Sequence, residues 1–231
     1  MMATQTMAIV EYPSSDGKPM AESDVHIDIL ADIRARLKAW AASRENVYAA
    51  GNMLVYYEEG NPKARLAPDC FVVFGVRNYD RSSFLTWSEG RTPRVVFEFT
   101  SRGTRKEDTV KKFAIYQNVW RVAEYFLFDP MEAYLKPSLR GYRLTDGVFQ
   151  PIPETDGTLH SEELDANLSR DGIRLRLEDV RTGKEFPLPM ERRAIKAEKI
   201  AARNQAALEQ AEAENARLKA ELAALKKKRS S

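Results

Sequence analysis

Two acidic side chains stand beside apolar runs, where an unpaired charge is costly. Asp69 follows Pro68 and immediately precedes the run Cys70–Phe74, and Glu98 is the only charge in the segment VVFEFT. A carboxylate buried in a strand without a partner either destabilises the fold or shifts its pKa until it is neutral. A strand acid of this kind therefore predicts a compensating cation, which is a Lys, an Arg or a metal ion.

Two such acids could support metal-assisted phosphoryl chemistry. Carboxylates from neighbouring strands, a backbone carbonyl and water offer the oxygen ligands that Mg²⁺ prefers. Such an ion polarises a phosphoryl oxygen and lowers the pKa of a bound water, and a nearby lysine stabilises the added negative charge. Glu98 lies 29 residues after Asp69 and is followed by Lys111 and Lys112, which favours this interpretation. A structural ion pair of Glu98 with Arg94 or Lys112 is the alternative.

Several other classes of site are disfavoured. The sequence contains no GxxxxGK[ST] or GxGxxG loop, no GxSxG elbow, and no HExxH or CxxC motif. Cys70 is the single cysteine and His26 and His160 are the only histidines, which excludes an intramolecular disulfide and a His-rich metal site. No apolar run approaches the roughly 20 residues of a membrane helix, and no secretion signal is recognisable. We therefore expect a cytoplasmic protein with no membrane segment.

The elements that must position these acids follow an α/β pattern. Apolar residues at helical spacing predict a helix over about 24–42. Continuous apolar runs are typical of strands buried on both faces, and they predict strands at 47–57 (broken at Gly51 and Asn52), 70–74, 94–99 and 125–128. This order predicts an α/β domain with a mixed central sheet flanked by helices.

The remaining parts of this domain are less regular. A helix is expected over 105–120, with its inward face formed by Val110, Phe113, Ala114 and Tyr116–Gln117. A hairpin is expected through 133–135 and 142–144, and further short β segments near 173–177. Residues 1–22 are expected to form a flexible N-terminal arm, and residues 23–190 the domain.

The composition changes abruptly at Glu191, after which neither Gly nor Pro occurs. Two core positions of a heptad repeat follow, one with Leu208, Asn215 and Leu222 and the other with Ala211, Leu218 and Leu225. A buried Asn at such a position typically selects a parallel dimer. Residues 191–231 therefore predict a coiled-coil helix with a basic end, and a homodimer formed through residues 194–226. A solvated single helix is the alternative, because so few heptads with many alanines are marginal alone.

The chain also resembles a known family. The most specific segments are EGNPKARLAPD (59–69), PRVVFEFTSRGTRKED (93–108), KKFAIY (111–116) and AEYFLFDP (123–130). They are similar to segments of the Uma-type restriction endonuclease family, a branch of the PD-(D/E)XK nuclease superfamily, and the likeness extends over about residues 26–189. Asp108, Lys112 and Tyr116 match the acid, the lysine and the tyrosine of the family's helix motif.

The resemblance implies a restriction endonuclease-like fold and a metal-dependent endonuclease that hydrolyses phosphodiester bonds in DNA. It implies that Asp69, Glu98 and the carbonyl of Phe99 bind Mg²⁺ or Mn²⁺. In the superfamily the lysine usually lies two residues after the second acid, where this chain has Thr100. In this family the lysine is moved to the following helix, where Lys112 would assist the attacking water.

The neighbour of that lysine is a competitor for the same task. Lys111 lies only about 100° round the helix from Lys112. The motif favours Lys112, and so does its four-residue spacing from Tyr116, which places the two side chains on one helix face.

Contacts with nucleic acid must come from local positive charge. The chain has a formal net charge of +2, but residues 191–231 carry 11 Lys and Arg against 6 Asp and Glu, which leaves 25 against 28 for the first 190 residues. Arg102, Arg105 and Lys106 follow the acidic strand and would lie near a phosphate backbone. A solvated cluster at the start of a helix is the alternative.

Two departures from the family pattern favour a second function. Asn52 stands where the most similar subgroup has an acid, and SRGT (101–104) replaces a proline-containing turn. A non-catalytic interaction module that recruits a partner through its coiled coil is therefore the alternative to an endonuclease. Cleavage of RNA or of a small phosphodiester would use the same site.

Overall fold

The computed structural model describes residues 10–15, 24–101 and 103–229, with side chains described up to residue 219. Contacts divide the chain into two compact units, residues 1–188 and residues 189–231. Most of the predicted N-terminal arm lies outside the described residues. Within its described part, the ring of Tyr12 packs 5.1 Å from that of Tyr56, whose hydroxyl donates a hydrogen bond to the carbonyl of Pro13.

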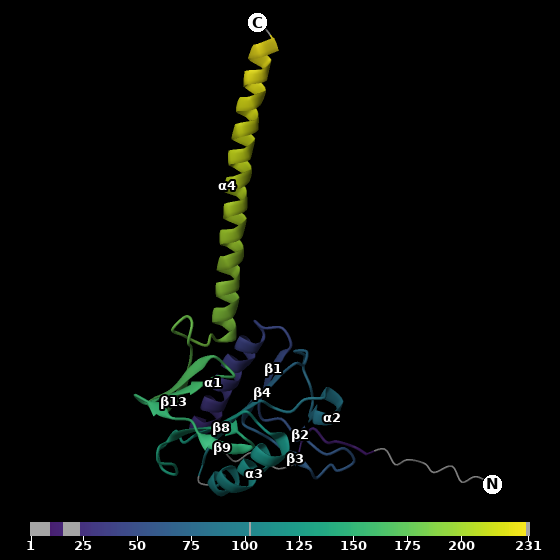
Figure 1. Ribbon diagram of the computed structural model, residues 1–231, viewed down its shortest axis with the longest axis vertical. Coiled ribbons are helices and arrows are strands. Elements are labelled where there is room, and N and C mark those ends of the chain that lie inside the picture. The colour runs from purple at the N-terminus through teal and green to yellow at the C-terminus, as the bar shows by residue number, and fades with distance from the viewer. Residues whose placement is uncertain (1–9, 16–23, 102, 230–231) are drawn as a thin grey trace, which may run out of the picture. The chain divides into compact units, whose positions relative to one another are not determined.

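The centre of the first unit is a six-stranded mixed sheet (Figure 1). In spatial order it contains β1 (Val47–Ala50), β4 (Cys70–Phe74), β6 (Val95–Phe99), β7 (Glu124–Phe128), β8 (Leu139–Thr145) and β9 (Val148–Pro151). β6 and β7 run parallel, and the other neighbours run antiparallel. The predicted mixed sheet flanked by helices is confirmed.

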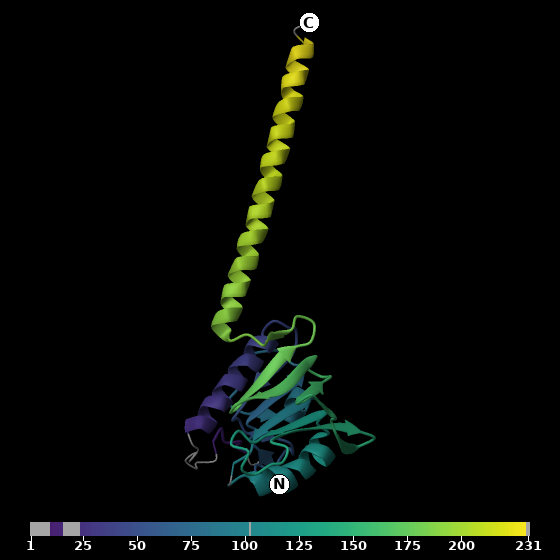
Figure 2. The same ribbon diagram turned by 90° about the vertical axis from the view of Figure 1, so that its left-hand side faces the viewer.

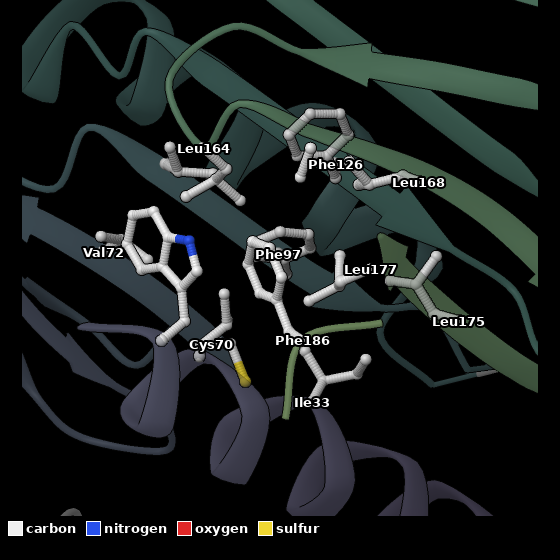
Figure 3. Close-up of a cluster of buried hydrophobic side chains, with 14 of the residues drawn as sticks. Ile33, Cys70, Val72, Phe97, Phe126, Leu164, Leu168, Leu175, Leu177 and Phe186 are labelled. Atoms are coloured by element: carbon white, nitrogen blue, oxygen red, sulfur yellow. The ribbon is translucent and has the colours of Figure 1, made fainter. Parts of the chain in front are cut away.

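One face of this sheet is covered by helix α1 (Asp24–Ala41) and by a second sheet (Figure 2). The second sheet is antiparallel and contains β10 (Glu154–Thr155), β11 (Thr158–Ser161), β12 (Ala166–Asp171), β13 (Arg174–Asp179) and β14 (Lys184–Glu185). Figure 3 shows Phe97 and Phe126 of the central sheet among Leu168, Leu175 and Leu177 of the second one. The predicted short β segments near 173–177 thus belong to a larger layer.

The opposite face is covered by a helix with two π-helical turns and by a small sheet. The helix contains η1 (Glu107–Lys112), α3 (Phe113–Ile115) and η2 (Tyr116–Trp120). The small sheet contains β3 (Arg65–Leu66), β2 (Val55–Tyr56) and β5 (Phe84–Leu85), and β5 leads into the short helix α2 (Thr86–Glu89). Because both faces are covered, β6 and β7 are buried along their whole length, as continuous apolar runs predict.

Two details of the predicted hairpin and helix were wrong. Residues 133–135 form no strand, because the buried carboxylate of Asp129 accepts the N–H groups of Met131 and Leu135 at 3.2 and 2.8 Å and folds the segment into a loop. The hairpin is formed by β8 and β9 instead. Val110 is 60% exposed, and Ala114 is exposed as well, so neither residue belongs to the inward face of the helix.

The second unit is helix α4 (Pro189–Arg229). Its described side chains include the exposed apolar residues Ile195, Ile200, Leu208 and Leu218. The side chains of Leu222 and Leu225 lie outside the described residues, so the heptad pattern stays a prediction there. Within the described ranges, no helix combines the length and the apolar character needed to cross a membrane.

Candidate functional site

The pairing of β4 with β6 brings the two acids of the sequence motif to the same end of the sheet. β4 and β6 are antiparallel, with Cys70 opposite Phe97 and Phe71 opposite Val96. Asp69 directly precedes β4 and therefore lies beside the end of β6 that contains Glu98 and Phe99. Side chains alternate along a strand, so Glu98 shares its face with Val96, whereas the side chain of Asp69, just before β4, reaches the backbone of β6. Glu98 lies on the face covered by the helix of residues 107–120.

The end of β6 fixes the carboxylate of Asp69. The N–H of Phe99 donates a hydrogen bond to Asp69 Oδ2 at 2.6 Å, so the acid continues the ladder where β4 has ended. In a strand, the N–H and C=O of one residue point to the same side. The carbonyl of Phe99 therefore points toward Asp69 as well.

Both oxygens of Glu98 are held by the covering helix. Lys112 Nζ donates to Glu98 Oε2 at 2.8 Å, and the hydroxyl of Tyr116 donates to Glu98 Oε1 at 2.5 Å. Glu98 is 1% exposed and Tyr116 is fully buried. Lys112 and Tyr116 are four residues apart and share one helix face, as their spacing predicts.

The charge of the site is unbalanced. Burial raises the pKa of Glu98 well above its usual value, and the nearby charges of Asp69 and Asp108 add to this effect although Lys112 opposes it. Burial lowers the pKa of Lys112, but the charges of Glu98, Asp108 and Asp69 outweigh burial and raise it. Lys112 is therefore protonated. The carboxyl groups of Glu98 and Asp108 contact this ammonium group, and Asp69 is a third acid close enough to influence its pKa, so a further cation would be stabilised here.

The site contains a third acid, Asp108. The apolar periodicity of the helix did not predict that this residue faces inward. Asp108 is 1% exposed, and its Oδ1 lies 3.0 Å from Lys112 Nζ. The inward face of the helix was predicted from its apolar residues alone. Asp108 was therefore missed, because Asp108 and Lys112 are polar yet pair inside the protein. The family motif was the only signal in the sequence that marked Asp108.

The other predicted site residues lie on the surface or are not described. Lys111 is exposed, and its Nζ lies 3.5 Å from Glu107 Oε1, so it does not enter the site. Arg105 and Lys106 are exposed at the start of the helix. Arg102 lies outside the described residues. Thr100, at the usual position of the superfamily lysine, is buried, and its N–H donates to the carbonyl of Phe128 at 2.8 Å.

The turn after β1 sets the position of Asp69, a constraint that sequence reasoning missed. A Cβ atom at Gly51 would lie 2.1 Å from the carbonyl oxygen of Asp69, so a larger residue cannot fit without moving this backbone. The N–H of Asn52 donates to the carbonyl of Pro68 at 2.9 Å. Asn52 itself adopts a left-handed conformation with φ of 53°. The sequence marked the Gly-Asn pair as a break in a strand and Asn52 as a departure from the family pattern, and neither observation revealed this constraint.

The predicted metal ligands have the right chemistry for a hard cation. In the described part of the chain, no three His, Cys, Asp or Glu side chains are grouped so that they could hold a metal ion. The predicted set is of another kind, with the carboxylates of Asp69 and Glu98 and the carbonyl of Phe99. All of these donors are oxygens, which suits Mg²⁺ or Mn²⁺, and the excess negative charge favours a cation.

Comparisons with known proteins give two similarities. Residues 5–176 match the profile of the Uma2 family, which is described as a putative restriction endonuclease. A solved structure from Anabaena variabilis ATCC 29413, described as a putative nuclease belonging to DUF820, shares 15% sequence identity with a TM-score of 0.45. The alignment with it covers 65% of this chain and 81% of the other one. No curated protein matches the chain.

Proposed function

Because the chain belongs to the Uma2 restriction endonuclease family, as its sequence segments predicted, we propose that it is a metal-dependent endonuclease that hydrolyses phosphodiester bonds in DNA. The observation that carries the proposal is the contact of Lys112 Nζ with Glu98 Oε2 at 2.8 Å, at the end of β6 where Asp69 accepts the N–H of Phe99. Two carboxylates and a lysine thus meet at one end of β6.

In this proposal, Asp69, Glu98 and the carbonyl of Phe99 hold Mg²⁺ or Mn²⁺. When bound, such an ion polarises a phosphoryl oxygen and lowers the pKa of a water molecule. Tyr116 holds the second oxygen of Glu98 and thereby fixes the direction of the carboxylate. The protonated Lys112 orients the attacking water and stabilises the negative charge that develops on the phosphate.

The positively charged side chains at the start of the helix that carries Lys112 are proposed to bind the DNA backbone. Arg105 and Lys106 are exposed at the start of the helix that carries Lys112, and Arg102 precedes them in the sequence. Phosphate contacts of this kind fix the position of the duplex without reading its sequence. Cleavage of RNA or of a small phosphodiester by the same site is an outcome that substrate tests would reveal.

The proposal is tested by plasmid cleavage and by calorimetric titration with Mg²⁺ or Mn²⁺. We expect nicking of supercoiled DNA that stops when EDTA removes the metal, and weaker metal binding in Asp69→Asn. Val110→Ser, on the exposed side of the same helix, serves as the control and should cleave at the wild-type rate. Absence of both metal binding and cleavage in the wild type would contradict the proposal.

A second candidate is a non-catalytic interaction module. The observation that favours it is that both oxygens of Glu98 already accept hydrogen bonds within the protein, from Lys112 and Tyr116. Such a satisfied carboxylate could be purely structural. This candidate predicts no metal binding in the calorimetric titration, whereas the endonuclease predicts binding.

We also propose that the protein is a cytoplasmic homodimer formed through residues 194–226. The described side chains of α4 are exposed, apart from the half-buried Arg192, and Leu208 and Leu218 are 60% and 49% exposed at two core positions of the heptad repeat. A long helix that is polar over most of its surface gains stability when such residues pack against a second helix. A dimer would supply two sites, which suits the cleavage of both strands of a duplex.

A further inference from the structure

Asp108 is a buried acid to which the proposed reaction gives no task. Neither of its carboxylate oxygens accepts a hydrogen bond from the part of the chain that the structure describes, and the side chain is 1% exposed. Its Oδ1 lies 3.0 Å from Lys112 Nζ. Burial of a carboxylate without hydrogen-bond donors is unfavourable, so packing alone does not explain an aspartate here.

The backbone around Asp108 is well fixed. Its N–H donates to the carbonyl of Thr104 at 2.9 Å. Its carbonyl accepts a hydrogen bond from the hydroxyl of the buried Tyr125 at 3.0 Å. Asp108 therefore presents its charge to Lys112 from a defined position.

Lys112 lies between two buried carboxylates. Its Nζ is 2.8 Å from Glu98 Oε2 and 3.0 Å from Asp108 Oδ1. The adjacent pair Glu107 and Lys111 has the same four-residue spacing but is exposed, with a contact of 3.5 Å. A four-residue spacing between an acid and a lysine therefore does not by itself bury the pair.

The two partners of Lys112 differ in what a metal ion would do to them. Glu98 is in the proposed ligand set, and a divalent cation bound to it would repel the ammonium group of Lys112. Asp108 lies outside the proposed ligand set, which contains Asp69, Glu98 and the carbonyl of Phe99. Asp108 would then be the carboxylate that still attracts Lys112.

We propose that Asp108 is a positioning residue that keeps the ammonium group of Lys112 in the site when a divalent cation is bound at Glu98. The proposal rests on the proposed metal-dependent function. Without Asp108, the long and flexible side chain of Lys112 would turn toward solvent as the metal binds. Asp108 acts through Lys112 and does not touch the substrate.

The test measures how fast Lys112 is acylated by an amine-reactive acetylating reagent, with and without Mg²⁺, by residue-resolved mass spectrometry of the full chain. In the wild type, Lys112 should react equally slowly under both conditions. In Asp108→Asn, Mg²⁺ should raise the rate at Lys112 about tenfold, which corresponds to the loss of one charged partner. Lys63, which is exposed and lies outside this helix, is the internal reference.

The matched control is Glu107→Gln, which removes the acid of the exposed neighbouring pair and should leave the Mg²⁺ response of Lys112 at the wild-type level. Asp108→Glu, which keeps the charge, should restore slow acylation. An equal Mg²⁺ response in wild type and Asp108→Asn would overturn the proposal. So would a wild-type Lys112 that becomes reactive when Mg²⁺ is added, a result that needs no variant to fold.

Failure of the proposed function is distinguishable from failure of this inference. If calorimetry detects no binding of Mg²⁺ or Mn²⁺ to the wild type, the metal-dependent function falls, and the role of Asp108 falls with it. If the wild type binds metal but Asp108→Asn gives the wild-type acylation pattern, only the role of Asp108 is refuted.

Discussion

Lys112 reaches Glu98 from the helix that follows the acidic strand, with its Nζ 2.8 Å from Glu98 Oε2. The residue two positions after Glu98 is Thr100, whose buried side chain supplies no charge. The lysine of this site therefore comes from a different element than the acid with which it pairs. If Lys112 acts in the proposed reaction, the π-helical turn over Glu107–Lys112 and the position of the helix over β6 matter for activity as well as for folding.

The first prediction concerns the hydroxyl of Tyr116. Tyr116→Phe removes the donor to Glu98 Oε1 and leaves that oxygen unpaired inside the protein. We expect a loss of about 1–3 kcal/mol in the free energy of unfolding. We also expect about a tenfold loss in cleavage, since residues that orient a ligand affect activity by this order. Urea unfolding and plasmid cleavage measure the two effects.

The control for Tyr116→Phe is Tyr142→Phe, because the ring of Tyr142 packs 6.3 Å from Tyr125 on the same face of the sheet. A loss of stability in both variants with no loss of cleavage in either would show that the contact of Tyr116 with Glu98 is only structural.

The second prediction concerns Gly51. Gly51→Ala places a Cβ atom 2.1 Å from the carbonyl oxygen of Asp69, so the backbone of one of them must move. We expect a loss of about 1–3 kcal/mol in stability, as for other overpacked sites. Displacement of Asp69 should reduce cleavage about a hundredfold. Gly103→Ala, where an added Cβ meets nothing nearer than 3.9 Å, is the control for unfolding.

The third prediction concerns the pH dependence of stability. Burial raises the pKa of Glu98 in the folded state, above its unfolded value of about 4.3. The folded protein thus binds a proton that the unfolded protein has released, and stability falls as the pH rises above that value. Glu98→Gln has no ionisable group at this position, so its stability should not fall with pH for this reason. The stability of the wild type relative to Glu98→Gln should therefore decrease from pH 4.5 to pH 8 in urea unfolding without metal.

A constant difference between these two proteins across that pH range would contradict the raised pKa of Glu98. At neutral pH, Glu98→Gln should also have lost detectable cleavage. The effects of this one substitution on stability and on activity can then be compared.

The fourth prediction concerns the oligomeric state of the full chain. Leu208→Glu and Leu218→Glu place charges at two predicted core positions of the heptad repeat and should convert a dimer to a monomer in sedimentation experiments. Ala213→Glu lies at an outer position of the repeat and should leave the dimer intact. A monomeric wild type would contradict the proposed homodimer and favour the solvated single helix.

The sequence predicted the buried strands well and their surroundings less well. Cys70–Phe74 and Val95–Phe99 were recognisable because strands covered on both faces are continuously apolar. The five-stranded second sheet was largely missed, since its longer strands β12 and β13 alternate between buried and partly exposed residues and contain no continuous apolar run. Such segments carry a weak local signal, and long-range packing decides their structure.

Site residues that a sequence motif marks could be predicted. Site residues whose position depends on tertiary packing could not. Lys112 was preferred to Lys111 from the motif, and Asp69 and Glu98 were marked by their place beside apolar runs. The inward position of Asp108 was missed, because periodicity assigns polar residues to the solvent face of a helix. The need for glycine at position 51 depends on how closely two backbones approach, which no single sequence reveals.

The most direct test of the account compares plasmid cleavage by Lys112→Ala and Lys111→Ala with Mg²⁺ present. The two lysines are adjacent, but only Lys112 contacts Glu98, while Lys111 is exposed. The account predicts that Lys112→Ala cleaves about 10²–10³-fold more slowly than wild type and that Lys111→Ala cleaves at nearly the wild-type rate. Equal cleavage by both variants, or a larger loss in Lys111→Ala, would contradict it.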